Sequence, residues 1–138
     1  MRTTRAVTAA LAAGLSAGLL VAGCGGGGGG GGSNNKSVTV TAPSGGGPAT
    51  VTIDAYDVYF SPNSVKAPAG KLTIDYKELG SQQHTLVIDG VKNFKLAVGP
   101  SAKSDSGTVD LAPGSYTFYC TIPGHRAQGM QGTITVAS

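Results

Sequence analysis

The sequence of 138 residues contains no tryptophan, and only 12% of its residues are charged. The aromatic residues are five tyrosines and three phenylalanines, whereas glycine occurs 23 times. Glycine is unfavourable in the interior of a helix and suits turns and linkers. A helical bundle is therefore not expected, and the length limits the chain to one folded domain. Only two cysteines are present, Cys24 and Cys120, and they need not pair.

The charge of the chain gives no support to a nucleic-acid partner. The formal net charge is +3 and the pI is near 9.0, but Arg2, Arg5 and Lys36 precede the region expected to fold. From Ala49 onward the sequence has seven basic and seven acidic residues. A neutral domain lacks the basic surface needed to hold a polyanion, so no nucleic acid is expected as a partner.

Residues 1–23 have the pattern of an export signal. Two arginines are followed by an uncharged apolar run, Ala6 to Val21, which ends in the sequence Leu-Val-Ala-Gly-Cys at Cys24. This pentapeptide resembles the lipobox of bacterial lipoproteins, which implies cleavage before Cys24 and lipidation of its thiol. The alternative, a transmembrane helix, is less favoured because the run is at the short end of the roughly 17–25 residues needed to span a bilayer. We expect an extracytoplasmic protein, anchored by lipid to the bacterial cell membrane.

Residues 24–48 have the composition of a tether. Eight consecutive glycines follow Cys24, and the next residues are rich in serine, asparagine, threonine and glycine. A flexible chain of this length has an r.m.s. span of about 25–30 Å, which would hold a domain just above a membrane.

Residues 49–138 alternate between short apolar patterns and turn residues. Apolar side chains recur at every second position, as in Leu72, Ile74 and Tyr76, and this period is typical of half-buried strands. Proline and glycine pairs such as Pro113-Gly114 separate the strands. Seven or eight such strands in about 90 residues predict an all-β, antiparallel Greek-key β-sandwich. This domain is small enough to gain stability from a bound metal.

Four side chains in this domain have the chemistry of a metal site: His84, Cys120, His125 and Met130. Two imidazoles and a thiolate in a trigonal plane, with a weak axial thioether, suit copper and its one-electron chemistry. Cys120 and His125 would also serve as the nucleophile and base of a hydrolase, but no third group stands out to orient them. Zinc is a further alternative, although methionine is a poor zinc ligand.

The same residues resemble the cupredoxins, the blue copper family that includes plastocyanin, azurin and halocyanin. The resemblance covers about residues 49–138 and is carried by Cys-x4-His-x4-Met, by the strand that begins at His84, and by the stretch from Phe60 to Leu72. It implies His84, Cys120 and His125 as equatorial copper ligands and Met130 as the axial ligand. It also implies that the amides of Thr85 and Ile122 donate to the Cys120 sulfur, whereas Pro123 has no amide hydrogen to donate.

The function that this resemblance implies is outer-sphere transfer of single electrons, not enzymatic catalysis. A monomer with one copper ion would dock transiently with a redox donor and a redox acceptor. Two alternatives remain open: a lipoprotein that binds or delivers copper, and a metal-free adhesion module. Reversible redox cycling would favour the first function, and ready transfer of Cu(I) to an acceptor would favour delivery.

Overall fold

Residues 35–138 are the part of the chain that the computed structural model describes, and they contain ten β-strands and no α-helix. The strands, in chain order, are β1 (Ser37–Thr39), β2 (Ala49–Tyr56), β3 (Tyr59–Ser61), β4 (Ser64–Pro68), β5 (Gly70–Glu78), β6 (His84–Ile88), β7 (Lys95–Val98), β8 (Ser104–Leu111), β9 (Gly114–Tyr119) and β10 (Gln131–Ala137). No helix that could cross a membrane occurs among the described residues. The expected signal peptide, the lipidated Cys24 and the glycine tract lie outside the described residues.

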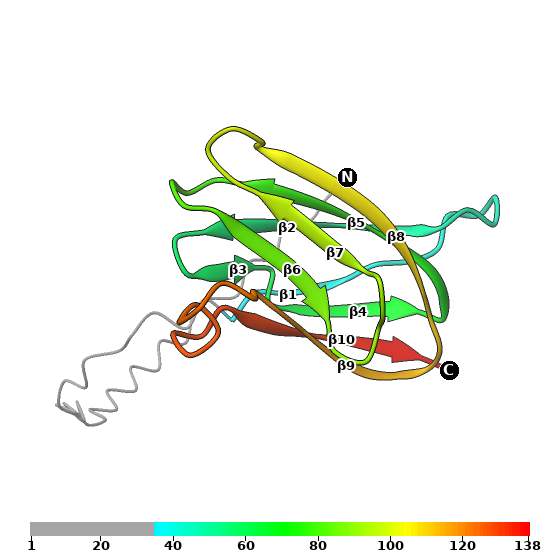
Figure 1. Ribbon diagram of the computed structural model, residues 1–138. Helices are drawn as coiled ribbons and strands as arrows, with labels where there is room; N and C mark the ends of the chain where they lie inside the picture. The colour runs from blue at the N-terminus through cyan, green and yellow to red at the C-terminus, as the bar shows by residue number, and fades with distance from the viewer. Residues whose placement is uncertain (1–34) are drawn as a thin grey trace, which may run out of the picture. The chain divides into compact units, whose positions relative to one another are not determined.

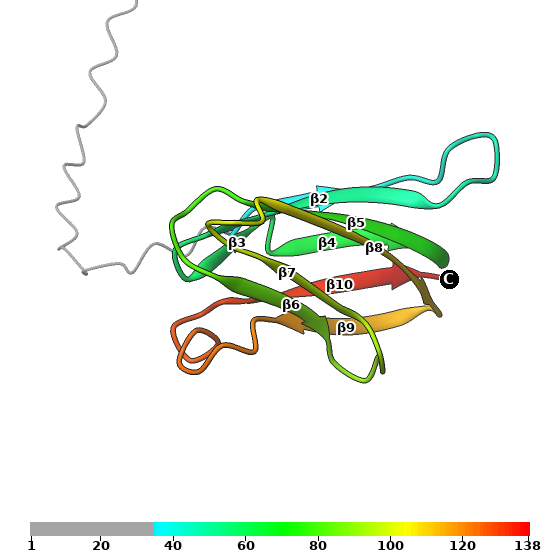
Figure 2. The same ribbon diagram turned by 45° about the horizontal axis from the view of Figure 1, so that its top comes forward.

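The strands form two sheets that pack against each other as a sandwich (Figures 1 and 2). The first sheet has the order β1-β4-β10-β9-β6-β7 and the second has the order β3-β2-β5-β8. The predicted all-β sandwich is confirmed, but three short strands (β1, β3 and β4) bring the number in the described residues to ten.

Both sheets are mixed, whereas the sequence pattern predicts an antiparallel sandwich. β4 pairs in parallel with β1 and β10, and β2 pairs in parallel with β5. Parallel neighbours need a connection of about a dozen residues. The chain between β2 and β5 provides it by forming β3 and then crossing to the other sheet as β4. Alternation along a strand fixes which side chains face inward, but not the direction of its neighbour.

The ordered structure begins before Ala49, the boundary expected from the sequence. Ser37–Thr39 forms β1 and pairs in register with Ser64 to Lys66 of β4, so this part of the expected tether belongs to the first sheet. The half-buried side chain of Val38 packs against the core. A three-residue strand with a single inward side chain is too short to show a period of two. It also lies in a polar, glycine-rich segment, so the sequence pattern does not predict it.

The core lies between the two sheets and follows the alternation of apolar side chains. In β2, Val51, Ile53 and Ala55 are buried while their neighbours face outward or are partly exposed. The ring of Phe60, on β3, lies 5.2 Å from that of Phe118, on β9, which joins the two sheets. This apolar contact fixes the separation of the sheets near the end where the metal-binding side chains gather.

That end of the sandwich carries three connections that are far apart in the sequence. The β9–β10 loop, the β2–β3 hairpin and the start of β6 lie at the same end (Figures 1 and 2). β6 pairs with β9 through Val87–Tyr119 and Ile88–Phe118. The pairing brings the first residues of β6 close to the residues that follow β9.

A substitution at Gly132, on β10, tests how tightly the side chains at this end of the sandwich are packed. A Cβ at this position would overlap the Phe118 ring and the backbone carbonyl of Asn63. We expect Gly132→Ala to lower the free energy of unfolding by about 1–3 kcal/mol, because an extra methyl in a filled space displaces its neighbours. Denaturant unfolding measures the change. Gly45→Ala is the control, since a Cβ there would meet nothing within 4 Å. Equal losses in both variants would contradict this account of the packing.

Candidate metal centre

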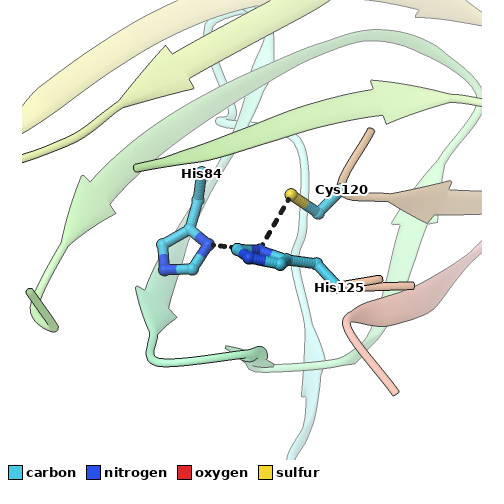
Figure 3. A group of neighbouring side chains, drawn as sticks. All are labelled: His84, Cys120 and His125. Atoms are coloured by element: carbon cyan, nitrogen blue, oxygen red, sulfur yellow. Dashed lines mark hydrogen bonds between the residues drawn. The ribbon is translucent and has the colours of Figure 1, made fainter. Parts of the chain in front are cut away.

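Three buried side chains converge where β6 begins and β9 ends (Figure 3). The Nδ1 atoms of His84 and His125 are 3.2 Å apart, and Nδ1 of His125 lies 3.6 Å from Sγ of Cys120. One ligand atom from each of the three residues lies within 4.8 Å of the other two. Atoms with this spacing surround a point about 2 Å from each, which is the usual bond length from imidazole nitrogen or thiolate sulfur to a metal ion such as zinc. The three residues therefore fit a single metal ion.

Cys120 owes its position to β9 and to the turn that follows. Phe118 faces the core, so the residue two positions later has the same orientation, and the Cys120 side chain is only 1% exposed. The Cys120 amide donates to the Met130 carbonyl oxygen over 3.1 Å. The first and last residues of the loop are thus tied together.

The chain from Cys120 to Met130 folds as a series of tight turns. The His125 amide donates to the Ile122 carbonyl, and the Met130 amide donates to the His125 carbonyl. Gly124 and Gly129, which directly precede His125 and Met130, have φ of 86° and 104°. Residues with a Cβ rarely adopt these values. Each glycine therefore lets the chain reverse just before a residue of the expected ligand set.

Met130 lies next to Cys120 and His125. Its side chain is fully buried, and its backbone is hydrogen-bonded to both Cys120 and His125. The loop thus brings Cys120, His125 and Met130 together, and β6 contributes His84 at its first residue. The structure groups all four residues that the sequence singles out as metal ligands.

Thr85 supplies the hydrogen bonds to the Cys120 sulfur. Its amide donates to Sγ over 3.4 Å, and its hydroxyl lies 3.7 Å from the same atom. The amide of Thr121 donates to the Thr85 hydroxyl oxygen over 2.8 Å, which joins β6 to the loop. These donors stabilise negative charge on the sulfur.

Ile122 and Pro123 have other roles in the structure. No hydrogen bond from the Ile122 amide to Sγ occurs among the described residues, although the family resemblance implies one. The Ile122 carbonyl accepts the His125 amide over 3.1 Å. Pro123 is exposed beside the loop, and Ile122 is partly buried against the core.

The environment of His84 keeps its imidazole neutral. Burial lowers the pKa of His84, and the nearby His125 lowers it further, while Asp57 acts in the opposite direction. A lowered pKa means that the ring is unprotonated at neutral pH, as metal binding requires. Burial also raises the pKa of Tyr76, and negative charge on Cys120 and Glu78 adds to this effect.

Glu78 is part of this environment, although the sequence analysis does not identify it as a site residue. Its Oε2 lies 3.9 Å from Nε2 of His84, and both side chains have no exposed surface. Burial raises the pKa of Glu78, whereas the backbone of Gly80 and the charge of Lys103 act in the opposite direction and favour the carboxylate. A signal was present in the sequence: Leu72, Ile74 and Tyr76 face inward, and the period of two continues to Glu78. A carboxylate at an inward position needs a partner or a function.

The donor set distinguishes among the metals and reactions considered above. A thiolate, two imidazoles and a thioether combine soft and borderline donors, which suits copper better than zinc. The residue that donates to the Cys120 sulfur is Thr85, and among the described hydrogen bonds no carboxylate or amide side chain orients His125 as the base of a hydrolase. An all-β sandwich with this buried donor set defines a mononuclear type 1 copper protein.

Comparison with known proteins leads to the same class. Residues 35–136 match the cupredoxin-like domain family, and the chain belongs to this family. The chain is 35% identical to plastocyanin from Prochlorothrix hollandica over 103 residues, which cover 64% of this chain and 73% of the relative.

Solved structures of auracyanins share the fold. Reduced auracyanin from Roseiflexus castenholzii is 26% identical and superposes with a TM-score of 0.58, covering 64% of this chain and 97% of that protein. Auracyanin A from Chloroflexus aurantiacus, described as a "blue" copper protein, superposes with a TM-score of 0.56 at 22% identity, covering 66% of this chain and all of that protein.

The Thr85 hydroxyl is a structural link that can be tested without copper. We expect Thr85→Val to lower the free energy of unfolding of the metal-free protein by about 1 kcal/mol, because the Thr121 amide loses its acceptor. Thr108→Val is the matched control, since its hydroxyl bond to Thr73 is exposed and water can replace it. Denaturant titration compares the two variants. A loss in Thr108→Val as large as that in Thr85→Val would rule out a special role for the buried hydroxyl.

Proposed function

We propose that this protein carries single electrons on one copper ion, between a redox donor and a redox acceptor at the outer face of a bacterial cell membrane. The observation that carries the proposal is the buried convergence of His84, Cys120 and His125 around one point, with the buried Met130 hydrogen-bonded through its backbone to Cys120 and His125. The similarity to plastocyanin supports it.

Copper bound at this site would supply a one-electron couple between Cu(I) and Cu(II). The chain itself holds the ligands in a fixed arrangement. Cys120 and Met130 are joined through their backbones, and Thr85 fixes the sulfur from the β6 side. Side chains that are already in place for both oxidation states need to move little when an electron arrives, and this favours rapid transfer.

His125 connects the site to the surface. It is 9% exposed, whereas His84 and Met130 have no exposed surface. Around it the chain presents small or apolar residues, Pro123, Gly124 and Ala127, which are exposed. Arg126, which is also exposed, adds one positive charge at the edge of this patch. A small, largely apolar patch suits brief contact with a redox partner. We therefore assign the face around His125 as the docking surface of a monomeric carrier.

The location rests on the N-terminal sequence. A signal peptide at residues 1–23 and a lipidated Cys24 would anchor the protein outside the cytoplasm, and the glycine-rich stretch that follows would give it reach. The described strand β1 shortens the expected tether to the residues that precede Ser37. A carrier held in this way would meet partners in or on the same membrane.

Electron transfer explains the site better than copper delivery does. A delivery protein must pass its metal to the ligands of an acceptor, whereas here three of the four ligands are at most 1% exposed. Among the described hydrogen bonds, no third side chain orients the Cys120–His125 pair as a nucleophile and base. Repeated voltammetric cycles without loss of copper would support the carrier. Rapid loss of Cu(I) to a chelator at micromolar concentration would support delivery.

Cys120→Ser tests the thiolate. Because Cys120 is the one cysteine among the described residues, its replacement should remove the intense sulfur-to-copper absorption and at least 90% of the redox current. Visible spectra of Cu(II)-loaded wild type and variant provide the measurement. Full colour in the variant would refute the assignment of Cys120 as a ligand.

Met130 is expected to act as the weak axial ligand, and its variants should change the potential more than the binding of copper. Met130→Leu should raise the potential, because Cu(II) loses more than Cu(I) when the thioether is removed, and Met130→Gln should lower it. We expect shifts of roughly 59 mV or more, which is a tenfold change for one electron. Voltammetry at one pH measures both variants. An unchanged potential, or loss of copper as complete as in Cys120→Ser, would exclude the axial role.

Cys24→Ser tests the anchor. The variant should lose acylation and move from the membrane fraction to the soluble fraction, while the spectrum of the copper domain stays the same. Mass spectrometry of the wild type measures the modification directly. An uncleaved, unmodified N-terminus would exclude lipidation at Cys24.

A further inference from the structure

Glu78 lies at an inward-facing position of β5, where the other side chains are apolar. It is the last residue of β5, whose inward positions are Leu72, Ile74, Tyr76 and Glu78. The residue is 3% exposed, and its side chain has no exposed surface. Removing a carboxylate from water is costly unless it gains partners. An apolar residue would satisfy the packing here, so a glutamate calls for a specific role.

The carboxylate oxygens of Glu78 and one ring nitrogen of His84 make no hydrogen bond to other described residues. Among the described residues, Oε1 and Oε2 of Glu78 and Nε2 of His84 are buried atoms without a hydrogen-bond partner. Nε2 and Oε2 lie 3.9 Å apart. This separation exceeds a hydrogen bond by about 1 Å, so a hydrogen bond forms only if the two groups move closer together. Buried polar groups are nearly always paired, which makes these two atoms natural partners.

The chemistry of a metal-bound imidazole determines which atom donates. His84 directs Nδ1 toward His125, on the side where Cys120 also lies (Figure 3), and Nε2 toward Glu78. A neutral imidazole that binds a metal through Nδ1 carries its proton on Nε2. That N–H is buried and needs an acceptor, and the buried Glu78 carboxylate, 3.9 Å away, is a candidate.

We propose that Glu78 is a positioning residue for copper, which accepts a hydrogen bond from Nε2–H of His84, fixes its tautomer and ring orientation, and lowers the reduction potential with its negative charge. A carboxylate paired with a ligating histidine makes that ligand more basic, and added negative charge near the site favours Cu(II) over Cu(I). The proposal rests on the proposed function, since it concerns the potential of the same site.

Asp57, the other carboxylate nearby, has a different role. Its Oδ1 accepts the Ser81 amide over 2.9 Å, and its Oδ2 lies 3.1 Å from the Ser81 hydroxyl. Asp57 is exposed, whereas Glu78 is buried. Asp57 thus holds the turn before β6. One of its carboxylate oxygens also lies within 4.8 Å of ligand atoms of Glu78 and His84, but because Asp57 is exposed, water screens its charge more strongly than that of the buried Glu78. This difference between two neighbouring carboxylates provides a matched control.

The first experiment measures the reduction potential of the copper-loaded full domain in three forms: wild type, Glu78→Gln and Asp57→Asn. Both variants remove one negative charge and keep the size of the side chain. We expect Glu78→Gln to bind one copper ion and to shift the equilibrium toward Cu(I) at least tenfold, which is 59 mV for one electron. Asp57→Asn should shift it less than threefold. A shift below threefold in Glu78→Gln, or equal shifts in both variants, would overturn the proposal.

A second experiment examines the wild type alone, so it does not depend on how a variant folds. In the diamagnetic Cu(I) form, ¹⁵N-edited NMR of the histidine rings should show a proton on Nε2 of His84 that exchanges slowly with water. A ring without a proton at Nε2, or a proton that exchanges as fast as that of an exposed imidazole, would overturn the proposed hydrogen bond.

The two measurements separate this proposal from the function on which it rests. If the wild type binds no copper or does not cycle reversibly, the proposed electron transfer fails, and the role of Glu78 fails with it. If the wild type cycles normally but Glu78→Gln keeps its potential, only the positioning role is refuted.

Discussion

Burial of the metal-binding side chains at one end of an apolar sandwich is the constraint on which the rest of the site depends. Inside the sandwich a polar atom without a partner costs free energy, so each donor must be satisfied by the protein or by a metal. Sγ of Cys120 receives the amide of Thr85, and the His84 and His125 Nδ1 atoms face each other. The lone pairs of Sγ and of the two Nδ1 atoms are directed toward one point, where a single metal ion can bind all three atoms.

The same constraint explains the form of the β9–β10 loop. Three of the four ligands come from eleven consecutive residues, and this segment must be rigid to hold their donor atoms at fixed positions. The backbone hydrogen bond from Cys120 to Met130 joins the two ends of the loop. The bond from the Met130 amide to the His125 carbonyl ties its end to its middle. Two glycines with positive φ allow these reversals without strain. A loop held in this way presents nearly the same ligand geometry whether or not the ion changes its charge.

Much of the fold and of the donor set can be predicted from the sequence, because both depend on short-range regularities. A period of two identifies long strands such as β2 and β5, and fixed spacing in one loop links Cys120, His125 and Met130. The elements that escape prediction depend on contacts distant in sequence. β1 is ordered by pairing with β4, and the parallel pairing of β2 with β5 follows from the crossover through β4. The donation from the Ile122 amide, which the resemblance implies, is absent among the described hydrogen bonds, and the path of the loop after Cys120 decides whether that amide can reach the sulfur.

The distribution of exposure around the site divides it into two sides with different tasks. On the inner side, His84 is fully buried between Cys120, Glu78 and the strands that carry them, so its surroundings are set by the protein alone. On the outer side, His125 reaches the surface among small residues. Water and salt screen the interactions of charges at the surface, but they screen the interactions of buried charges much less. A charge on the inner side would therefore act on the potential with little screening, while the outer side, which carries the exposed Arg126, would serve brief contact with a partner. In this arrangement a substitution at the docking face can change the choice of partner without changing the energy of the electron being carried.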